Sequence, residues 1–266
     1  MNDRQPPQRT LLRAIAAGLF CAILVAPPVR GQTTSDPDGT PHTAPLESYS
    51  WRNPASEKIV LVGDSTVQST SGWGDGFAAS LKANAECINL AKGGRSTRTF
   101  REEGRWAQAL ALHPDVILLG FGHNDLQLKP DRHVDLADFR INLLRFVKEA
   151  RAAGIRIVLT TPIAYRRWNK DGSLRPVAPL VDDYDRATRD IAKQENIPFL
   201  DIATLSAAFY QRIGKQAMDS YSLHSHDAVD PAHLNREGGQ ALGALIAQQA
   251  RAELRWLAPY ILPAPL

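Results

Sequence analysis

The chain alternates short apolar runs with segments of helical periodicity, and this alternation limits its fold more than any other feature of the sequence. The apolar runs are rich in Val, Ile and Leu. Such runs are typical of strands that are buried on both faces of a parallel sheet. Five runs are expected to be strands: 58–62, 87–90, 116–119, 155–160 and 198–201.

Helices are predicted between these runs. The clearest covers residues 136–153, where Phe139, Leu143 and Val147 recur at helical spacing and Gly154 ends the segment. The other predicted helices cover 73–84, 105–112, 181–195, 202–215 and 236–254, with Asn235 placed to cap the last one, and 161–180 and 216–232 are expected to be loops. Strands that alternate with helices predict an α/β fold, a three-layer α/β/α sandwich with a central parallel five-stranded sheet.

The first residues have the pattern of a secretory signal peptide. Arginines precede a short apolar run at 14–26, and Pro27-Pro28 and the small residue Gly31 follow it. We expect 1–31 to be this signal, with cleavage after Gly31, and 32–56 to be a flexible leader rich in Thr, Ser, Pro and Asp. An uncleaved anchor or an amphipathic helix is the alternative. The signal predicts a secreted or periplasmic protein.

Charge and cysteine content change when this segment is set aside. The whole chain has a formal net charge of +3 and two cysteines, Cys21 and Cys87. Residues 1–31 contain four Arg, one Asp and Cys21, so the remainder has no net charge and one cysteine. This argues against a globally basic surface for nucleic acid. Cys87 is expected to be a buried, unreactive thiol, and no intramolecular disulfide is possible.

Chemistry in a parallel α/β sheet is expected in the loops that follow the carboxyl ends of the strands. The first such loop is Gly63-Asp64-Ser65-Thr66. Gly63 permits a sharp turn, and the turn would present Ser65 as a nucleophile, with nearby backbone N–H groups facing the group that it attacks. An ordinary structural turn has the same composition and is the alternative.

Two further loops have the composition of an oxyanion site. The loop 89–97 contains Gly93-Gly94, which permits close backbone approach and offers N–H donors; a structural or phosphate-binding turn is the alternative. The loop 120–125 contains Asn124, whose side-chain N–H can stabilise a developing oxyanion without ionising. An Asx turn is the alternative for Asn124.

The last loop contains Asp230-Pro231-Ala232-His233, just before the final helix. Asp230 can orient His233, and His233 can take the proton of Ser65. The alternative is an acidic turn with an exposed histidine. Nearby His224-Ser-His226-Asp227 resembles a metal cluster, but no further ligand pair stands at a usable spacing, so no metal site is predicted.

Taken in order, these loops resemble the four motif blocks of the SGNH (GDSL-type) hydrolase superfamily. The resemblance implies the flavodoxin-like fold of that superfamily. The blocks are Gly63–Thr66, Gly93–Ser96, Gly122–Asp125 and Asp230–His233. The match is closer to one branch, the rhamnogalacturonan acetylesterases, which the chain resembles in Thr66, in the stretch 100–106, and in Trp73, Thr161-Pro162, Arg166-Arg167 and Asp171-Gly172. The resemblance covers residues 58–250 and predicts a hydrolase domain at 57–266.

The resemblance implies a role for each matched residue. Ser65 would be the nucleophile, His233 the general base and Asp230 its orienting partner. The oxyanion hole would consist of the N–H groups of Ser65 and Gly94 and the side chain of Asn124. No cofactor and no metal are expected, because N–H donors would meet the charge of the transition state.

The resemblance and the predicted signal together imply a secreted serine esterase that removes acetyl groups from a pectic polysaccharide of the rhamnogalacturonan type, without stable membrane association after signal cleavage. Trp73, Arg166, Arg167 and Trp168 are candidate substrate contacts; Arg166 and Arg167 would meet a uronate carboxylate and Trp168 a sugar face. A solvated basic loop is the alternative for these arginines. A broad acyl esterase or lipase, and a non-catalytic carbohydrate-binding protein on this fold, are the alternative functions.

Overall fold

A five-stranded parallel sheet forms the centre of the computed structural model, which describes residues 56–225 and 228–264. Its order is β2-β1-β3-β4-β5, in which the five strands are β1 (Glu57–Gly63), β2 (Ala85–Asn89), β3 (Val116–Gly120), β4 (Arg156–Thr160) and β5 (Phe199–Leu200). All neighbouring strands run parallel. The predicted α/β fold and its strands are therefore confirmed, within a residue or two at each end.

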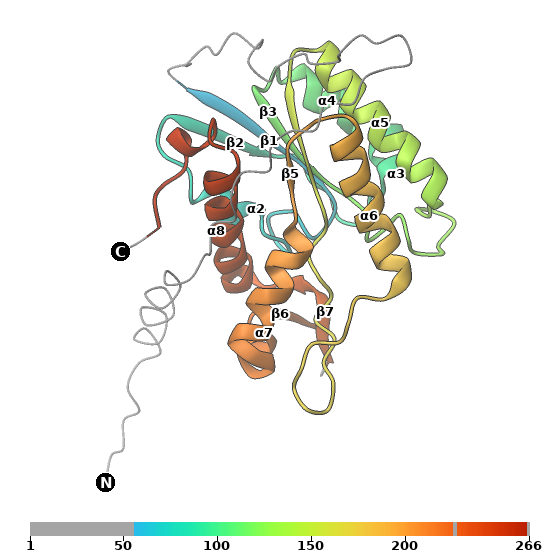
Figure 1. Cartoon of the computed structure of the whole chain (residues 1–266), viewed down its shortest axis with the longest axis vertical. Helices are drawn as coiled ribbons and strands as arrows, with labels where there is room; N and C mark the ends of the chain where they lie inside the picture. Colours follow the sequence, from blue (N-terminus) through green and yellow to red (C-terminus); the bar gives the residue numbers. More distant parts are fainter. Residues whose placement is uncertain (1–55, 226–227, 265–266) are drawn as a thin grey trace, which may run out of the picture. The chain divides into compact units, whose positions relative to one another are not determined.

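Alternate residues of β1 face two different cores. Ile59 and Leu61 pack with residues of α2 (Gly74–Ala78), α7 (Ile202–Ser220) and α8 (Arg236–Glu253). Val60 and Val62 pack on the opposite side with residues of α3 (Thr97–Glu102), α4 (Arg105–Ala111), α5 (Leu136–Ala152) and α6 (Pro179–Gln194). Because side chains of a strand alternate between faces, this apolar run supports both helical layers (Figure 1).

The strand order places the candidate loops at one point of the sheet. β2 and β3 flank β1 on opposite sides, so the connections after β1 and β3 turn toward different helical layers. A crevice opens at such a switch point, at the carboxyl ends of the strands, and ligands bind there in open α/β sheets. Ser65 follows β1 and Asn124 follows β3, so both lie at this crevice.

The predicted helix 73–84 is much shorter in the structure. α2 ends at Ala78, and the residues after it pair instead with the end of the chain: Leu81 forms an antiparallel bridge with Ile261. α2 also packs unusually close to α8. A Cβ at Gly243 of α8 would lie 2.3 Å from the Trp73 carbonyl oxygen, so only glycine permits this approach.

The prediction of a loop at 216–232 is wrong over most of its length. α7 continues to Ser220, past a kink at Gly214, and the antiparallel strands β6 (Ser222–Ser225) and β7 (Ala228–Leu234) follow it. These strands form a separate two-stranded hairpin outside the main sheet. The strands of the hairpin were not predicted, because the polar segment 222–230 has little of the apolar alternation that indicates a strand.

Three other local features bear on the sequence-based expectations. The short helix α3 after the glycine loop was not predicted; Ser96 caps it by accepting a hydrogen bond from the Thr99 N–H. The predicted cap of the last helix is present, since Asn235 accepts from the Gly238 N–H at 2.9 Å. Cys87 is free and only half-buried, whereas a buried thiol was expected; burial still raises the pKa of its thiol to about 12, which fits an unreactive side chain.

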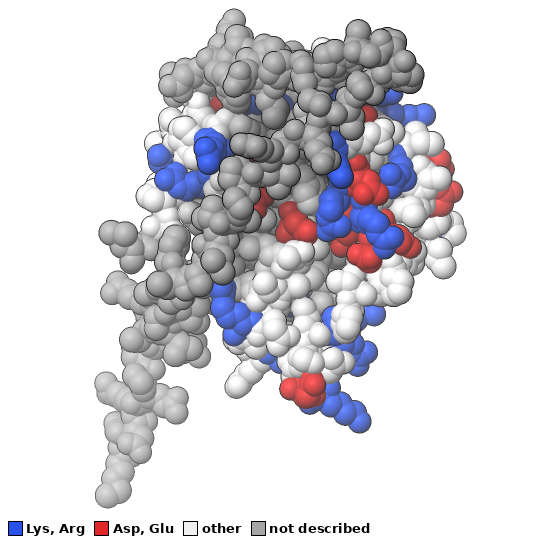
Figure 2. Space-filling model, in the orientation of Figure 1, with Lys and Arg blue, Asp and Glu red and all other residues white. Residues whose placement is uncertain are grey.

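The expected signal peptide (1–31) and all but the last residue of the expected leader (32–56) lie outside the described residues. All the elements above belong to one unit, Ala55–Leu262. Within the described part of the chain, no helix is long and apolar enough to span a bilayer. Figure 2 shows basic and acidic side chains intermixed over α5 and α6, and the ion pair of Arg140 with Asp190 links these two helices.

Candidate active site

Ser65 lies in a tight turn that begins where β1 ends. The Asp64 carboxylate accepts hydrogen bonds from the N–H and the hydroxyl of Thr66, both at 2.8 Å, and the Ser71 hydroxyl donates to the Ser65 carbonyl at 2.7 Å. A Cβ at Gly63 would lie 2.6 Å from the Gly120 carbonyl oxygen, so the turn needs glycine there. The turn is thus fixed on both sides of a half-buried serine.

His233 and Asp230 reach Ser65 from the hairpin. The His233 Nε2 lies 2.7 Å from the Ser65 Oγ, and the His233 Nδ1 lies 2.8 Å from the Asp230 Oδ2. The other Asp230 oxygen accepts from the N–H groups of Ala232 and His233, at 2.7 and 2.9 Å. The structure therefore joins the three residues, from two distant parts of the chain, into one line of hydrogen bonds.

The Asp230 carboxylate is held in its charged form. Partial burial acts to raise its pKa, but the hydrogen bonds from the His233 side chain and from the backbone N–H groups of His233 and Ala232 outweigh burial. The pKa of Asp230 therefore lies below its usual value. A carboxylate in this position fixes the imidazole so that Nδ1 carries a proton and Nε2 faces the serine hydroxyl as an acceptor.

Donors for an oxyanion surround the serine. Gly94, in a left-handed conformation with φ of 79°, and Asn124 line the same cavity as Ser65. Among the described residues, the N–H groups of Ser65 and Gly94 find no acceptor. The Asn124 Nδ2 donates to the Arg95 carbonyl at 3.0 Å and to the Asp64 carboxylate at 3.3 Å, which anchors the amide beside the cavity.

A second carboxylate, Asp125, is fully buried directly behind Asn124. One of its oxygens accepts from the N–H and the hydroxyl of Thr97, at 2.9 and 2.5 Å, and the other has no partner among the described residues. Desolvation raises the pKa of Asp125 to about 7, against the opposing effect of the Thr97 hydrogen bonds. Asp125 belongs to the third motif block, but no role was predicted for it from the sequence.

These groups open into a cavity of about 280 Å³. Its wall includes two cations that the sequence analysis did not single out, Lys129 and Arg132, from the loop that follows Asn124. Arg132 pairs with Asp131 at 2.6 Å, whereas Lys129 forms no ion pair with a described residue. The remaining lining residues are Ser65, Gly94, His123, Asn124, Gln127, Tyr165, Ala232 and His233.

Two stacked rings form part of the same wall. His123 and Tyr165 lie with ring centroids 4.3 Å apart and an interplanar angle of 19°. His123 is buried, and desolvation lowers the pKa of its imidazole, so this ring is neutral at ordinary pH. The pair gives the cavity a flat, partly apolar wall beside the donors.

The four predicted substrate contacts divide into two groups. Trp73 is 1% exposed in the core around β1, and Arg166 is 4% exposed with its guanidinium bound to backbone carbonyls, so neither offers a surface to a sugar. Arg167 is exposed and lies over the Tyr165 ring at 5.3 Å. Trp168 is half-buried and bridges to Leu174. Of the four, only Arg167 is both exposed and in contact with a residue of the cavity wall, Tyr165.

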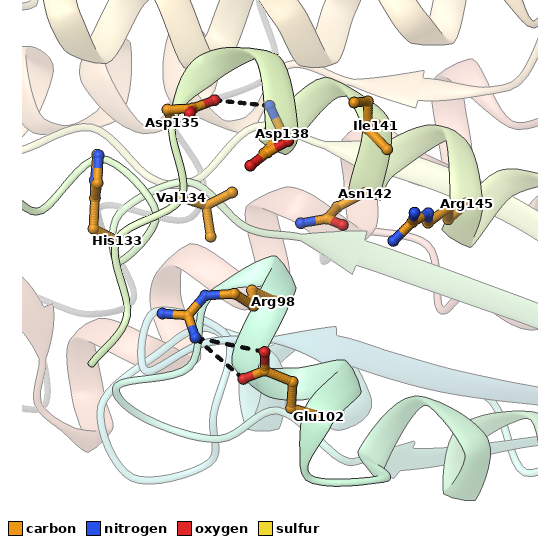
Figure 3. Close-up of a pocket in the computed structure, with 9 residues that line it drawn as sticks. All are labelled: Arg98, Glu102, His133, Val134, Asp135, Asp138, Ile141, Asn142 and Arg145. Carbon is orange, nitrogen blue, oxygen red and sulfur yellow. Dashed lines mark hydrogen bonds and ion pairs between the residues drawn. The ribbon is translucent and has the colours of Figure 1, made fainter. Parts of the chain in front are cut away.

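A larger cavity, of about 420 Å³, lies between α3 and the start of α5 (Figure 3). Several of its charged side chains are bound within it: Arg98 turns toward Glu102, and Asp135 caps the helix by accepting from the Asp138 N–H. It contains no serine, threonine or cysteine nucleophile. The smaller cavity, which contains Ser65 and His233, is therefore the candidate active site.

The segment 224–227, for which no metal site is predicted, can be followed only in part. His226 and Asp227 lie outside the described residues, and the His224 Nε2 lies 3.0 Å from the Asp219 carbonyl oxygen. No group of three potential metal ligands occurs within the described ranges 56–225 and 228–264.

The chain matches one protein family and is similar in sequence to several known proteins. The model of the GDSL-like lipase/acylhydrolase family matches residues 61–241. Two Bacillus subtilis proteins are similar over most of their length. The "Probable rhamnogalacturonan acetylesterase YesY" is 31% identical, over 71% of this chain and 90% of that protein. The rhamnogalacturonan acetylesterase RhgT is 30% identical, over 72% of this chain and 88% of that protein.

Solved structures share the fold. The crystal structure of the Bacillus subtilis protein YxiM matches with a TM-score of 0.65 and 24% identity, over 74% of this chain and 56% of that one. The acetylxylan esterase Axe2 of Geobacillus stearothermophilus matches with a TM-score of 0.55 and 20% identity, over 75% of this chain and 94% of that one. At these identities the likeness concerns the fold alone.

Proposed function

Because the chain belongs to the GDSL-like lipase/acylhydrolase family and is a carboxylic ester hydrolase, we propose that it removes acetyl groups from an acidic, pectic polysaccharide outside the cytoplasm. The family and the esterase class agree with the prediction from the motif blocks, which is thereby confirmed. The observation that carries the proposal is the line from Asp230 through His233 to the Ser65 Oγ. The acetylesterase relatives support the acetyl group as the acyl part.

The proposed reaction has two halves. The Ser65 oxygen attacks the acetyl carbonyl while His233 takes the hydroxyl proton on Nε2. The carbonyl oxygen becomes an oxyanion that the N–H groups of Ser65 and Gly94 and the amide of Asn124 stabilise. The sugar alcohol leaves with the proton from His233. Water, activated by the same nitrogen, then attacks the acetyl-serine and releases acetate.

Asn124 has to change one contact during this reaction. In the structure both hydrogens of its Nδ2 are used, toward the Arg95 carbonyl and toward Asp64. The contact to Asp64 is the longer and therefore the weaker of the two. We propose that this hydrogen is shared with the oxyanion as charge develops, while the Arg95 carbonyl holds the amide in place.

The substrate part of the proposal is supported by the charge of the cavity wall. Lys129 and Arg132 line it, and Arg167 lies beside its Tyr165 wall, whereas Asp131 is the acidic residue that pairs with Arg132. A lysine at the rim that forms no ion pair with a described residue favours a substrate with carboxylates, such as a uronate polymer, over a neutral xylan. The predicted signal at 1–31 supports an exported protein.

Acetate release from acetylated rhamnogalacturonan fragments and from acetylxylan tests the substrate. We expect faster release from the acidic fragments, with a KM that rises with salt because screening weakens the attraction. Lys129→Ala should raise this KM and leave the KM for acetylxylan unchanged. Lys193→Ala, on the exposed side of α6, is the matched control. Equal rates on both polymers, or an unchanged KM in Lys129→Ala, contradict the acidic substrate.

A broad acyl esterase is the second candidate, and one observation favours it. Leu128, between the lining residues Gln127 and Lys129, is 83% exposed, so it presents an apolar surface at the rim. Hydrolysis of p-nitrophenyl esters of increasing acyl length separates the two functions. A rate that falls steeply beyond acetate supports the acetylesterase, and a rate that is flat or rises supports the broad esterase.

A further inference from the structure

Arg166 holds the segment that contains Asp230 and His233, although the two segments lie more than sixty residues apart in the chain. Its guanidinium Nη2 donates to the carbonyls of Asp230 and His233, at 3.1 and 2.6 Å, and its Nη1 to the carbonyl of Ala232 at 3.4 Å. Its backbone N–H donates to the Pro231 carbonyl at 2.8 Å. One residue therefore binds the carbonyls of four successive residues.

These carbonyls need a partner because the hairpin does not supply one. The pairing of β7 with β6 steps from Val229, opposite His224, to Leu234, opposite Ser222. The four residues 230–233 thus stand against Leu223 alone, as an enlarged bulge. Bulged residues leave the ladder, and buried backbone carbonyls without a partner are costly. Arg166 replaces the missing ladder over the segment where the base lies.

The rest of the Arg166 side chain is fixed as firmly as its tip. It is 4% exposed, its Nε donates to the Ser222 hydroxyl at 2.9 Å, and its guanidinium lies over the Tyr210 ring at 5.4 Å. Ser222 in turn donates to the Met218 carbonyl in α7. No carboxylate pairs with Arg166 among the described residues, so carbonyl dipoles and a ring face surround its charge.

We infer that Arg166 is a positioning residue for catalysis, which keeps the His233 Nε2 within hydrogen-bond distance of Ser65 by binding the bulge 230–233. The inference rests on the proposed function, since it requires His233 to be the base. It replaces the predicted contact of Arg166 with substrate. Since Arg166 lies behind the base, its loss should displace the imidazole without removing any group that touches the sugar.

Kinetics on p-nitrophenyl acetate, a small neutral ester, test this role in the full chain. Arg166→Met fills much of the same volume but donates no hydrogen bond. We expect its kcat to fall about 10²-fold, as a displacement near 1 Å causes, while KM changes less than about twofold. Phosphonylation of Ser65 by a fluorophosphonate should slow by a similar factor. Arg166→Lys restores part of the donor set and should recover about tenfold of the lost rate.

The controls separate positioning from folding and from the substrate proposal. Arg186→Met, on the exposed side of α6, should keep the wild-type kcat. Circular dichroism and thermal unfolding show whether Arg166→Met is folded; if it is not, Arg166→Lys decides by the same kcat and KM measurement.

The inference is overturned if Arg166→Met is folded and has the wild-type kcat, or if only its KM changes. If Arg166→Met is not folded, the same two results in Arg166→Lys overturn the inference. If Ser65→Ala abolishes activity while Arg166→Met keeps it, only the positioning role of Arg166 is contradicted, and the proposed reaction stands. If aryl acetate is hydrolysed but pectic fragments are not, the substrate proposal fails and the role of Arg166 stands.

Discussion

Ser65 and His233 meet at one hydrogen bond of 2.7 Å, but different parts of the fold hold them. Ser65 follows β1, a fully paired strand of the main sheet, and the Asp64 carboxylate closes its turn. His233 lies in a bulge of the small hairpin β6–β7, where Arg166 takes the place of strand pairing. The first region depends on local turn chemistry and the second on one distant side chain.

This difference separates two requirements of the proposed reaction. The nucleophile and the oxyanion donors need a fixed geometry with respect to one another, and the crevice of the sheet provides it through β1, β3 and their loops. The base needs its own orientation, which Asp230 supplies within three residues of His233. A side chain that is distant in sequence then aligns the two regions. Variants in each region therefore have different expected effects.

The largest effect is expected where the two regions act as one unit. Ser65→Ala and His233→Ala should each lower kcat by about 10⁴-fold or more, and the double variant should lose no more than either alone. The physical reason is that each residue works only through the other. Steady-state kinetics on aryl acetate measure all three variants. Losses that multiply in the double variant would show that Ser65 and His233 act independently.

A smaller effect is expected within the sheet region alone. Asn124→Ala removes one oxyanion donor while Ser65, His233 and Asp230 keep their contacts, so kcat should fall by about 10² to 10³-fold. KM should change little, because the oxyanion exists only after attack. Asn169→Ala, in the exposed loop after β4, is the matched control. A loss seen in KM instead of kcat would place Asn124 in substrate binding.

The sequence predicted the sheet region better than the hairpin region, for physical reasons. Runs such as Ile59–Val62 are apolar at every position, which is typical of a strand that is buried on both faces of a parallel sheet. In the hairpin region, Asp230 and His233 could be paired from the sequence because they lie only three residues apart. The role of Arg166 was not visible, because its partners are backbone carbonyls that any sequence supplies. Trp73 and the short α2 also depended on distant contacts, with α8 and with the end of the chain.

The two regions should also differ in how their stability depends on pH, because burial raises the pKa of Asp125 and hydrogen bonds lower that of Asp230. Asp125, in the sheet region, has a folded-state pKa raised by burial to about 7, so the folded chain keeps a proton that the unfolded chain loses above its ordinary pKa of 3.8. The contribution of Asp125 to stability therefore falls as pH rises from about 4 to 7. Asp125→Asn cannot titrate. Its stability relative to wild type should rise over this range by up to about 1.4 kcal/mol per pH unit.

Urea unfolding of wild type and Asp125→Asn between pH 5 and 8 measures this slope. Asp230→Asn is the control from the hairpin region. The pKa of Asp230 is lowered, so its contribution is complete above its ordinary pKa and is lost only as pH falls below it. The titration of Asp230 itself should therefore add no slope from pH 5 to 8. Parallel behaviour of both variants would show that Asp125 is ionised in the folded chain.

The smallest effect is expected at the end of the hairpin, where β7 gives way to α8. Asn235 accepts from the Gly238 N–H at 2.9 Å and donates to the Ser220 carbonyl at 2.7 Å, so it joins α8 to the end of α7. Asn235→Ala should lower stability by about 1 kcal/mol, the usual cost of an N-cap. Asn235→Asp keeps the cap acceptor and loses only the donor, so it should retain most of that stability. Since Arg166 rather than this cap holds the bulge, kcat should stay within about twofold in both variants. A fall in kcat as large as that expected for Arg166→Met would mean that the helix, and not the arginine, aligns the base with Ser65.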